Sequence, residues 1–385
     1  MAYLMDHARQ KQQKIFLQFG GQGTTYLREL TTLYRDYPEL QPFFESVFNT
    51  LDEGLRYLKP QKSILPAGFD LKGWLDGQAV PDSSYLGICT VALSGVHITQ
   101  SAYYHLLTLH GHEPNLLLPE ISGMTGHSMG FHSAHLAALG LTGDAYFKAL
   151  RKFILFVLIG GYRCQEVFPI RDLPESLLEA SRQYDQEPPS PMASILGLNR
   201  PELQEWVTAF NQRKPDAHPL YISLVNTHES IVLCGYQEDL VAFRAAYYHE
   251  MERRETKWTY LEVSAPFHSG ILKPAWDAFK KDQEFIQFYY RGSDIKVPVY
   301  STESGQSIES IHDLYQFSFD LMTAAPLSWP ASIETILTDE DIGLVADFGP
   351  GRFSRSFTKK LLEERRPSLE VVSTANRKTL KQFLS

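Results

Sequence analysis

The sequence predicts an α/β protein in which a smaller α+β unit is inserted into a larger one. Stretches that begin near residues 15, 116 and 342 each show an apolar strand, a glycine-rich turn and a helix, the pattern of a parallel sheet with packed helices. Between the second and third stretches, strands and helices follow the order β-α-β-β-α-β, which is the split βαβ pattern of ferredoxin-like modules. With 43% hydrophobic and 21% charged residues, the chain has globular composition, and disorder is excluded as its main state.

Length, charge and cysteine content narrow the class of protein. At about 150 residues per domain, 385 residues allow two or three domains, or one large domain with an insertion. The net charge of -9 argues against a nucleic-acid partner, because such binders need surplus Lys and Arg to displace counterions. Three scattered cysteines without a CxxC pair predict neither a disulfide framework nor a zinc site. We therefore expect a reducing compartment and no bound metal.

The sequence shows no targeting or membrane segment. The N-terminal stretch MAYLMDHARQKQQKIF lacks an apolar run of signal-peptide length. The most apolar run, at 153–161, has about half the length that crosses a bilayer, so it is interpreted as a buried helix. These features predict a cytoplasmic protein without a membrane partner.

The elements of the larger unit follow from apolar spacing and from the positions of glycine and proline. In order, they are a strand at 15–19, a loop at 20–23, a helix within 26–51, an irregular stretch at 52–82, a helix at 85–110, a strand at 116–121, a turn at 123–130, a helix at 131–141, a strand at 342–348 and a helix at 354–364.

The inserted unit follows a break at 184–191, where the sequence YDQEPPSP interrupts regular structure. Its elements are predicted as strands at 192–198, 220–225, 230–235 and 257–263, with helices at 200–212 and 237–250. The predicted division is therefore a large subdomain, 1–191 and 265–385, and a small subdomain, 192–264.

A candidate nucleophile lies in Gly126-His127-Ser128-Met129-Gly130, which matches G-x-S-x-G. Glycines on both sides of the serine permit a sharp turn from strand to helix, and this turn lifts the hydroxyl out of the sheet. The free N–H groups and the positive dipole at the start of the following helix then face an oxyanion formed beside Ser128.

A serine hydroxyl needs a neighbouring base, and His268 in Ser264-Ala265-Pro266-Phe267-His268-Ser269 is the leading candidate. It follows a predicted strand at the junction of the two units, where a purely structural role is the alternative. His132 and His135 have a spacing that imitates a metal pair, but no Cys, Asp or Glu supports them at ligand spacing. His127 is expected to orient the turn.

Two glycine-containing motifs allow a structural interpretation. The loop Gly20-Gly21-Gln22-Gly23 lacks the third glycine of a dinucleotide fingerprint, since Tyr26 occupies that position. The loop is either a simple turn or a turn whose backbone N–H groups approach a ligand. In Asp347-Phe348-Gly349-Pro350-Gly351, the aspartate at the predicted strand end is interpreted as structural.

Taken together, these motifs resemble the malonyl/acetyl-CoA:acyl-carrier-protein acyltransferase superfamily. The shared features are GGQG at 20–23, GHSMG at 126–130, the βαββαβ insertion, SAPFHS at 264–269, APLSW at 325–329 and DFGPG at 347–351. The chain is most similar to the acetyltransferase domain of fungal fatty acid synthases and to the starter-unit acyltransferase (SAT) domains of fungal non-reducing polyketide synthases. FGGQGTT, TGHSMG, LFVLIGGYRCQEVFP and ISLVN carry the first likeness. Many SAT domains have cysteine as nucleophile, so a serine suits the branch that takes reduced chains from a partner synthase.

The resemblance implies an α/β-hydrolase-like large subdomain, a ferredoxin-like small subdomain and specific residue roles. It makes Ser128 the nucleophile and His268 its base, with the backbone N–H groups of Gln22 and Met129 as the oxyanion hole. It assigns the carbonyl that orients the histidine to Ser328. It also implies no permanent cofactor, an acyl-CoA or phosphopantetheine thioester substrate, an acyl carrier protein partner and membership of a larger multidomain synthase.

The resemblance also bears on which acyl group is transferred. Malonyl-specific members carry an arginine on the helix after the nucleophile, which pairs with the free carboxylate. The equivalent position here is Ile159, and an apolar residue there leaves a buried carboxylate without a partner. We therefore expect a neutral acyl group, acetyl or longer, with Phe131 and Phe267 as further selectivity residues.

Alternative functions are a serine esterase or thioesterase, a malonyl transacylase, and a degenerate module that only docks a carrier protein. The position of His268 directly after the insertion fits an α/β-hydrolase esterase poorly. Residues 351–385 hold nine Lys and Arg against three Glu, which makes this segment a candidate docking surface for an acidic carrier protein. A solvated helix face is the simpler interpretation.

Overall fold

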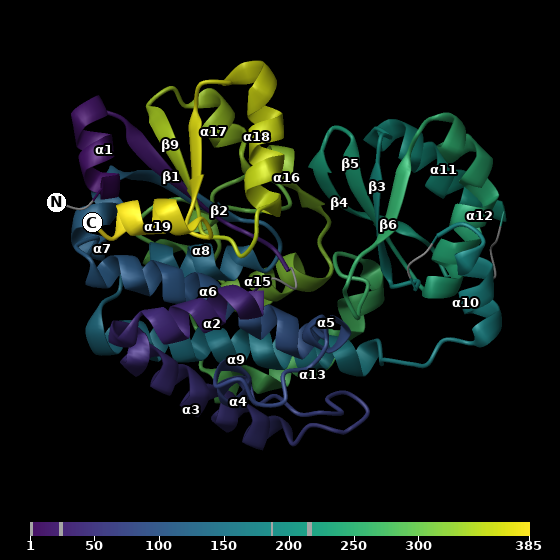
Figure 1. Ribbon diagram of the computed structural model, residues 1–385, viewed down its shortest axis with the longest axis horizontal. Coiled ribbons are helices and arrows are strands. Elements are labelled where there is room, and N and C mark those ends of the chain that lie inside the picture. Colours follow the sequence, from purple (N-terminus) through teal and green to yellow (C-terminus); the bar gives the residue numbers. More distant parts are fainter. Residues whose placement is uncertain (1–2, 23–25, 186–187, 214–217) are drawn as a thin grey trace.

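Two five-stranded sheets organise the protein and stand side by side in the computed structural model, which describes residues 3–22, 26–185, 188–213 and 218–385 (Figure 1). The first sheet has the strand order β10-β9-β1-β2-β7, and every strand pair in it is parallel. Its strands are β1 (Lys14–Phe19), β2 (Ile121–Gly126), β7 (Val299–Tyr300), β9 (Ile342–Asp347) and β10 (Glu370–Ser373). Because the pairs are parallel, the carboxyl ends of β1, β2 and β9 meet at one edge, where ligands bind in open α/β sheets.

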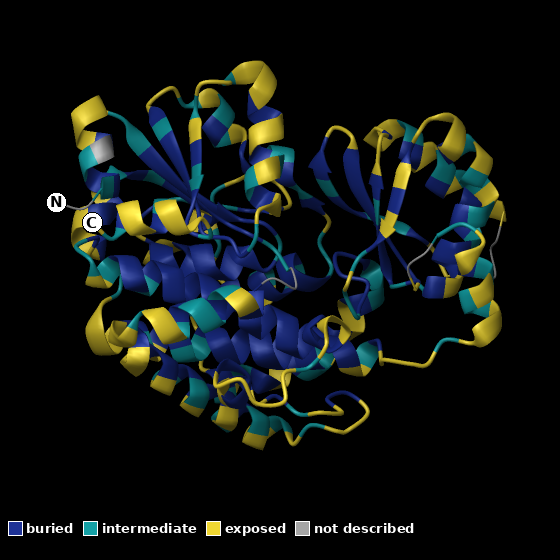
Figure 2. Cartoon of the chain, viewed as in Figure 1, coloured by how far each residue is buried: buried dark blue, intermediate teal, exposed yellow. Residues whose placement is uncertain are grey.

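Helices cover the first sheet, and the two longest lie in the interior. Figure 2 shows α6 and α9 as mostly buried, while the outer faces of α3 and α18 are exposed. The α-helices outside the second sheet are α1 (Tyr3–Lys11), α2 (Tyr26–Asp36), α3 (Gln41–Leu58), α4 (Leu71–Leu75), α5 (Ser83–Leu86), α6 (Cys89–Leu109), α7 (Pro114–Leu117), α8 (Gly130–Ala138), α9 (Gly143–Val167), α13 (Trp276–Phe279), α14 (Gln283–Ile286), α15 (Leu314–Thr323), α16 (Trp329–Ser332), α17 (Glu334–Thr338), α18 (Phe353–Arg365) and α19 (Arg377–Phe383). Short 3-10 turns are η1 (Pro38–Leu40), η2 (Leu118–Glu120), η3 (Gly270–Ala275), η4 (Lys280–Asp282), η5 (Gly292–Asp294) and η6 (Ile308–Ser310).

The second sheet has the strand order β6-β3-β5-β4-β8. Its elements are β3 (Met192–Leu196), β4 (Tyr221–Thr227), β5 (Ser230–Cys234), β6 (Lys257–Tyr260) and β8 (Leu327–Ser328), with α10 (Glu175–Arg182), α11 (Arg200–Arg213) and α12 (Gln237–Arg253). The first four strands pair antiparallel, in the ferredoxin-like order that the sequence pattern predicts. β8 comes from later in the chain and adds to β4 in parallel. The predicted α/β fold with a ferredoxin-like insertion is therefore confirmed.

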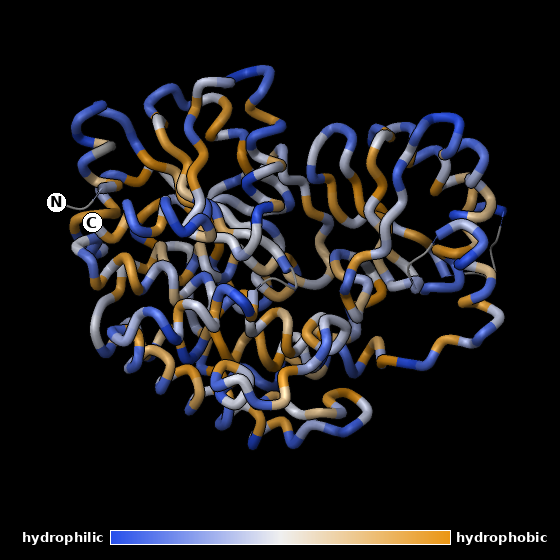
Figure 3. Tube along the Cα trace, viewed as in Figure 1, coloured by the Kyte–Doolittle hydropathy of each residue, from blue (hydrophilic) through white to orange (hydrophobic). Residues whose placement is uncertain are grey.

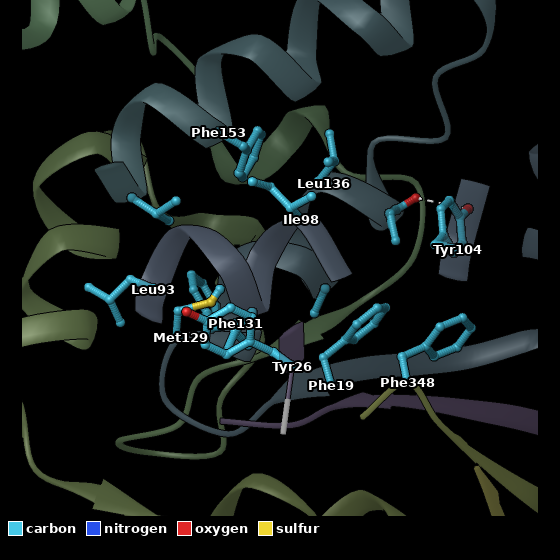
Figure 4. Packing of buried hydrophobic residues seen from close by; sticks show 14 of the residues in the cluster. Phe19, Tyr26, Leu93, Ile98, Tyr104, Met129, Phe131, Leu136, Phe153 and Phe348 are labelled. Atoms are coloured by element: carbon cyan, nitrogen blue, oxygen red, sulfur yellow. Dashed lines mark hydrogen bonds between the residues drawn. The ribbon is translucent and has the colours of Figure 1, made fainter. Parts of the chain in front are cut away.

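Each sheet has its own apolar core. In Figure 3 the strands β1, β3, β5 and β9 are mostly hydrophobic, whereas β6 (KWTY) is not. Beneath the first sheet, Figure 4 shows Phe19 and Phe348 side by side, and their rings stack at 4.8 Å between centroids. A separate cluster around Phe243 fills the space between the second sheet and its helices. The boundaries at 192 and 264 stay a prediction, and α10, which precedes residue 192, packs against α12.

Several predicted elements differ from the structure, and proline explains two of the differences. The predicted strand at 116–121 is instead α7 followed by η2, because Pro114 opens a helical turn and Pro119 lacks the N–H that a central strand needs. The strand begins at Ile121 and continues through 123–126, where we predicted a turn. Pro38 divides the helix predicted within 26–51 into α2 and α3.

Other boundaries also differ. α3 continues to Leu58 and α4 forms at Leu71–Leu75, so the stretch 52–82 is less irregular than predicted. The helix predicted over 85–110 is divided at Gly87, where an added Cβ would lie 2.7 Å from the carbonyl oxygen of Glu262. Gly23 of the predicted loop and residues 186–187 of the predicted break lie outside the described residues. Among the described residues, no helix combines the length and apolar character that a bilayer crossing requires.

Candidate active site

Ser128 stands at the tight turn between β2 and α8. Its φ of 52° lies in the left-handed region, a strained conformation for a residue with a side chain. The flanking glycines permit this turn, because a Cβ on Gly126 would collide with the backbone of Gly130, and one on Gly130 with the carbonyl of Phe19. α8 begins two residues after the serine, so its positive dipole end faces the hydroxyl.

His268 reaches Ser128 from the segment that follows β6. Its Nε2 lies 2.7 Å from Ser128 Oγ, within hydrogen-bond distance. The histidine also has a positive φ, 60°, and its backbone N–H donates to the carbonyl of Thr323 at 2.7 Å. The imidazole is buried with an exposed fraction of 2%. The structure therefore brings together two predicted residues that are far apart in the sequence.

The carbonyl that orients His268 belongs to Ala325, so the prediction of Ser328 is wrong. His268 Nδ1 lies 2.8 Å from the Ala325 oxygen, and an Nδ1–H donated there leaves Nε2 as the acceptor for the serine hydroxyl. Ser328 instead belongs to β8, and its carbonyl accepts a hydrogen bond from the Ser332 hydroxyl at 2.8 Å. The physical reason is that α15 ends at Thr323, whose carbonyl accepts the backbone N–H of His268, so the first carbonyl of the APLSW motif, two residues later, lies beside the imidazole.

Burial controls the protonation of His268. The pKa of His268 is lowered to about 4, mainly by removal from water; the hydrogen bond to Ala325 opposes this shift, and the nearby His127 adds to it. The imidazole is therefore neutral near pH 7 and able to accept a proton from Ser128.

The two backbone N–H groups predicted to form the oxyanion hole, those of Gln22 and Met129, have no hydrogen-bond acceptor among the described residues. The Gln22 side chain is occupied, because its Nε2 donates to the carbonyl of Gly87 at 3.1 Å. Met129 directly follows the serine at the start of α8, the position from which nucleophile-elbow enzymes donate an N–H.

Gln100 holds the glycine loop in place and was missed by sequence reasoning. Its Nε2 donates to the carbonyls of Gly20 and Gly349 at 2.7 and 2.5 Å, and the N–H of Gly20 donates to Gly349 at 2.8 Å. These bonds join the loops that follow β1 and β9. α6 carries several other buried polar residues, among them Ser94 and His97, so no local signal singles out Gln100.

His127 connects the nucleophile turn to the second sheet. Its Nε2 lies 2.8 Å from Oδ1 of Asn226 on β4, and its backbone N–H donates to the carbonyl of Phe19 at 2.7 Å. A Cβ on Gly21 would lie 2.6 Å from His127 Nδ1, so the glycine loop passes directly over the imidazole. The expectation that His127 orients the turn agrees with this position, and Asn226 was not predicted.

A pocket of about 320 Å³ opens beside these residues, between the two sheets. Gln22, His127 and Asn226 line it, together with apolar side chains from β4, β5 and the first turns of α18. Phe353 and Phe357 contribute on the α18 side, and Phe353 is among the most exposed large apolar residues, at 65%.

The predicted selectivity residues are all buried. Phe131 lies one turn along α8 from Ser128, with its ring centroid 6.2 Å from that of Phe317 on α15. Figure 4 shows Phe131 beside Met129 in the apolar cluster. Ile159 is on α9 and Phe267 directly precedes His268.

The remaining predicted polar residues have core positions. His132 and His135 are buried among aromatic rings, and burial lowers the pKa of each to about 3. The described residues contain no group of three potential metal ligands. Asp347 is buried and accepts hydrogen bonds from Gln18, Ser354, Ser373 and the Gly349 N–H, which agrees with its predicted structural role.

Comparison with solved structures identifies the class of fold. A malonyl-CoA:acyl carrier protein transacylase from Xanthomonas oryzae superposes with a TM-score of 0.67 at 18% identity, covering 97% of this chain and 98% of that one. MCAT from Streptococcus pneumoniae superposes with a TM-score of 0.66 at 19% identity, covering 96% and 99%. A type II polyketide synthase malonyl-transacylase, solved in complex with its acyl-carrier protein, gives 0.64 at 21% identity, covering 96% and 99%. The chain has the fold of these transacylases.

Sequence comparison then identifies the family. The family described as "Starter unit:ACP transacylase in aflatoxin biosynthesis" (SAT) matches residues 17–268, and the chain belongs to it. The fatty acid synthase beta subunit of Saccharomyces cerevisiae is 29% identical over 353 residues, 86% of this chain and 17% of that protein. Fatty acid synthase beta subunit pigK of Monascus ruber is 26% identical over 371 residues, 90% of this chain and 18% of that protein. The chain thus spans under a fifth of the length of these two curated relatives.

Proposed function

We propose that the chain is an acyltransferase that moves a neutral acyl starter unit, through an acyl-Ser128 intermediate, to the pantetheine thiol of an acyl carrier protein. The acyl donor is a thioester of CoA or of another carrier protein. The observation that carries the proposal is the 2.7 Å contact between Ser128 Oγ and His268 Nε2 at the start of α8. Membership of the SAT family supports acyl transfer to a carrier protein as the reaction.

The first half-reaction acylates the serine. His268 Nε2 accepts the hydroxyl proton while Oγ attacks the thioester carbonyl carbon, and the resulting oxyanion is bound by the N–H groups of Gln22 and Met129. The tetrahedral intermediate then collapses, the C–S bond breaks, and His268 returns the proton to the leaving thiolate. The Ala325 carbonyl keeps the imidazole in the required tautomer throughout.

The second half-reaction reverses these steps with a new thiol. His268 takes the proton from the carrier's pantetheine thiol, and the sulfur attacks the carbonyl carbon of the acyl-serine. The ester bond between this carbon and Ser128 Oγ then breaks. The histidine then returns the proton to Ser128 Oγ, so no proton is gained or lost over the cycle. No buried carboxylate is needed, because a backbone carbonyl orients the base.

The apolar surroundings favour a neutral acyl group over malonyl. Ile159 has an exposed fraction of 0%, and the space beside the neighbouring Gly160 is filled by Met322 and Phe279. A malonate carboxylate buried in such surroundings would lack a partner, which costs several kcal/mol. We propose that Ile159, Phe131 and Phe267 border the acyl chain.

The partner assignment is supported by the relatives. The transacylase of a type II polyketide synthase was solved bound to its acyl-carrier protein, and the fatty acid synthase beta subunits are much longer than this chain. We propose a carrier protein as acceptor and a multidomain synthase as the setting in which this chain acts.

The experiment follows the acyl group by intact-protein mass spectrometry. The chain is incubated with acetyl-CoA, hexanoyl-CoA or malonyl-CoA, the excess donor is removed, and holo carrier protein or buffer alone is added. The proposal predicts faster labelling by the neutral donors and transfer to the carrier that is much faster than loss to water. Preferential malonyl loading would overturn the selectivity, and loss to water at the same rate with or without carrier would indicate a thioesterase.

A further inference from the structure

A cationic groove lies at the carboxyl ends of β9 and β10, outside the proposed catalytic residues. Its volume is about 470 Å³, and it is lined by Arg28, Glu29, Gly351, Arg352, Arg355, Ser373, Ala375 and Asn376. The arginines come from separate places in the fold: α2, the turn before α18, and the first turn of α18. Crevices at this edge of an open parallel sheet are where α/β proteins bind ligands.

The arginine side chains retain free donors. Within the described part of the chain, the side chains of Arg28 and Arg352 make no hydrogen bond and no ion pair. Arg355 uses only Nε, which donates to the carbonyl of Val371 at 3.1 Å. Two guanidinium groups and the outer nitrogens of a third thus face the groove without a protein acceptor, and guanidinium geometry suits bidentate binding of phosphate.

The carboxylate of the groove is already occupied. Glu29 accepts the Gly351 N–H at 2.7 Å with one oxygen and the Tyr103 hydroxyl at 3.0 Å with the other. Burial raises the pKa of Glu29. Its role is to hold the turn before α18, and the groove keeps a net positive charge.

Several cations farther along this segment are engaged elsewhere. Lys360 pairs with Glu363 at 2.8 Å and Arg365 with Glu334 at 3.0 Å. Arg366 donates to backbone carbonyls, among them that of Ile342 at 2.7 Å. Arg377 pairs with Asp36 at 2.7 Å, so among the arginines of 351–385 only Arg352 and Arg355 keep both outer guanidinium nitrogens without an acceptor among the described residues, and both line the groove.

We propose that this groove binds the phosphate end of the pantetheine arm of the thioester substrate. This inference rests on the proposed function. The same phosphoryl chemistry occurs in CoA and in the phosphopantetheine group of a carrier protein, and the two sources are separated by the experiment below.

The position of α18 connects the groove to the proposed active site. Phe353, Ser354 and Phe357 line the pocket that contains Gln22 and His127. Arg352 and Arg355, on the same helical turn, line the cationic groove. The turn before α18 joins the two sites, because Pro350 lines the first pocket while Gly351 and Arg352 line the groove. An apolar arm that leaves the first pocket past this turn would bring the next anionic group to Arg352.

The experiment compares donors that differ only in phosphate. Single-turnover acylation of Ser128 is measured with acetyl-pantetheine, acetyl-phosphopantetheine, acetyl-CoA and acetyl carrier protein, in the wild type and in Arg28→Gln and Arg352→Gln. Arg365→Gln is the matched control, since it removes an arginine from the same helix outside the groove. Arg355 is left intact because its Nε bonds to the backbone.

The groove variants should raise the half-saturating concentration of the phosphate-bearing donors about tenfold each, as expected for a lost charge-assisted contact. The groove variants should leave the rate at saturation and the reaction with acetyl-pantetheine unchanged. The control variant should have the same kinetics as the wild type with every donor. An equal effect on acetyl-phosphopantetheine and acetyl-CoA locates the contact at the pantetheine phosphate. An effect on acetyl-CoA alone would overturn the assignment, because the nucleotide phosphates, and not the pantetheine phosphate, would then be the ligand.

An effect confined to the carrier protein would overturn the proposal, because carboxylates on that protein would then be the ligand. Unchanged kinetics with every donor would also overturn it. So would a rise in the half-saturating concentration of acetyl-pantetheine as large as that of the phosphate-bearing donors. Calorimetric titration of CoA into the Ser128→Ala chain gives a readout independent of catalysis: groove variants should weaken binding about tenfold. If the wild type were not acylated by any donor while this titration kept its arginine dependence, the proposed function would fail and the groove assignment would stand.

Discussion

The pH dependence of serine acylation tests the protonation state that the site imposes on His268. Burial lowers the pKa of this histidine to about 4, whereas a solvated histidine titrates near 6.5. The neutral imidazole is the active form, so activity is lost as the pH falls through the pKa of the folded protein. At pH 5.5, a pKa of about 4 leaves about 97% of the histidine neutral, and a pKa of about 6.5 leaves about 9%.

The assay is rapid-quench acylation at saturating acetyl-CoA between pH 5.5 and 7.5, read by intact mass, with circular dichroism at each pH to show that the chain remains folded. The structure predicts less than a twofold change in rate across this interval. A tenfold fall between pH 7.5 and 5.5 in folded protein, with an apparent pKa near 6.5, would refute the reasoning. His268 would then be solvated in the reacting state, or another group would act as the base.

The remaining predictions concern single substitutions and stability. His268→Ala should preserve the circular dichroism spectrum and slow acylation by about 10² to 10⁴, and an unchanged rate would move the base elsewhere. Ile159→Arg should raise malonyl over hexanoyl loading in a mixture of the two CoA esters, with a modest gain because the guanidinium loses hydration; an unchanged ratio would mean that Ile159 only packs. Asn226→Ala leaves the buried His127 Nε2 unpaired and should lower the free energy of unfolding in urea by about 1–3 kcal/mol, whereas an unchanged midpoint would exclude this contribution. Burial lowers the pKa of His97, His132 and His135 to about 3, so the unfolded state binds more protons below about pH 6.5 and stability should fall between pH 7 and 5.5, by on the order of 1 kcal/mol per histidine. His132→Asn should flatten this slope, and an equally steep slope in that variant would contradict the assignment.

The nucleophile turn could be predicted because its cause is local. Gly126 and Gly130 are the residues that let Ser128 adopt its positive φ, and both belong to the same five-residue motif. The order of strands and helices between 192 and 260 is equally local, so the ferredoxin-like sheet followed from apolar spacing. Pro119 disfavours a strand at 116–121, because it lacks a backbone N–H, but our prediction followed the apolar pattern alone.

The parts that sequence reasoning missed depend on contacts between distant segments. The motif APLSW contains several carbonyls, and only the end of α15 beside His268 selects that of Ala325. Asn226 meets His127 because β4 faces the nucleophile turn across the boundary between the sheets. Gln100 bridges loops that are 80 and 249 residues away in the sequence. No local pattern encodes these pairings.

The central claim is that Ser128 carries the acyl group, and peptide mapping of the acylated protein tests it most directly. The chain is treated with acetyl-CoA, quenched in acid and digested, and the acetyl group is located by tandem mass spectrometry in the wild type and in Ser128→Ala. The account predicts an ester on Ser128, removed by holo carrier protein, and no adduct in the variant. An adduct on another residue, or undiminished labelling of Ser128→Ala, would contradict it.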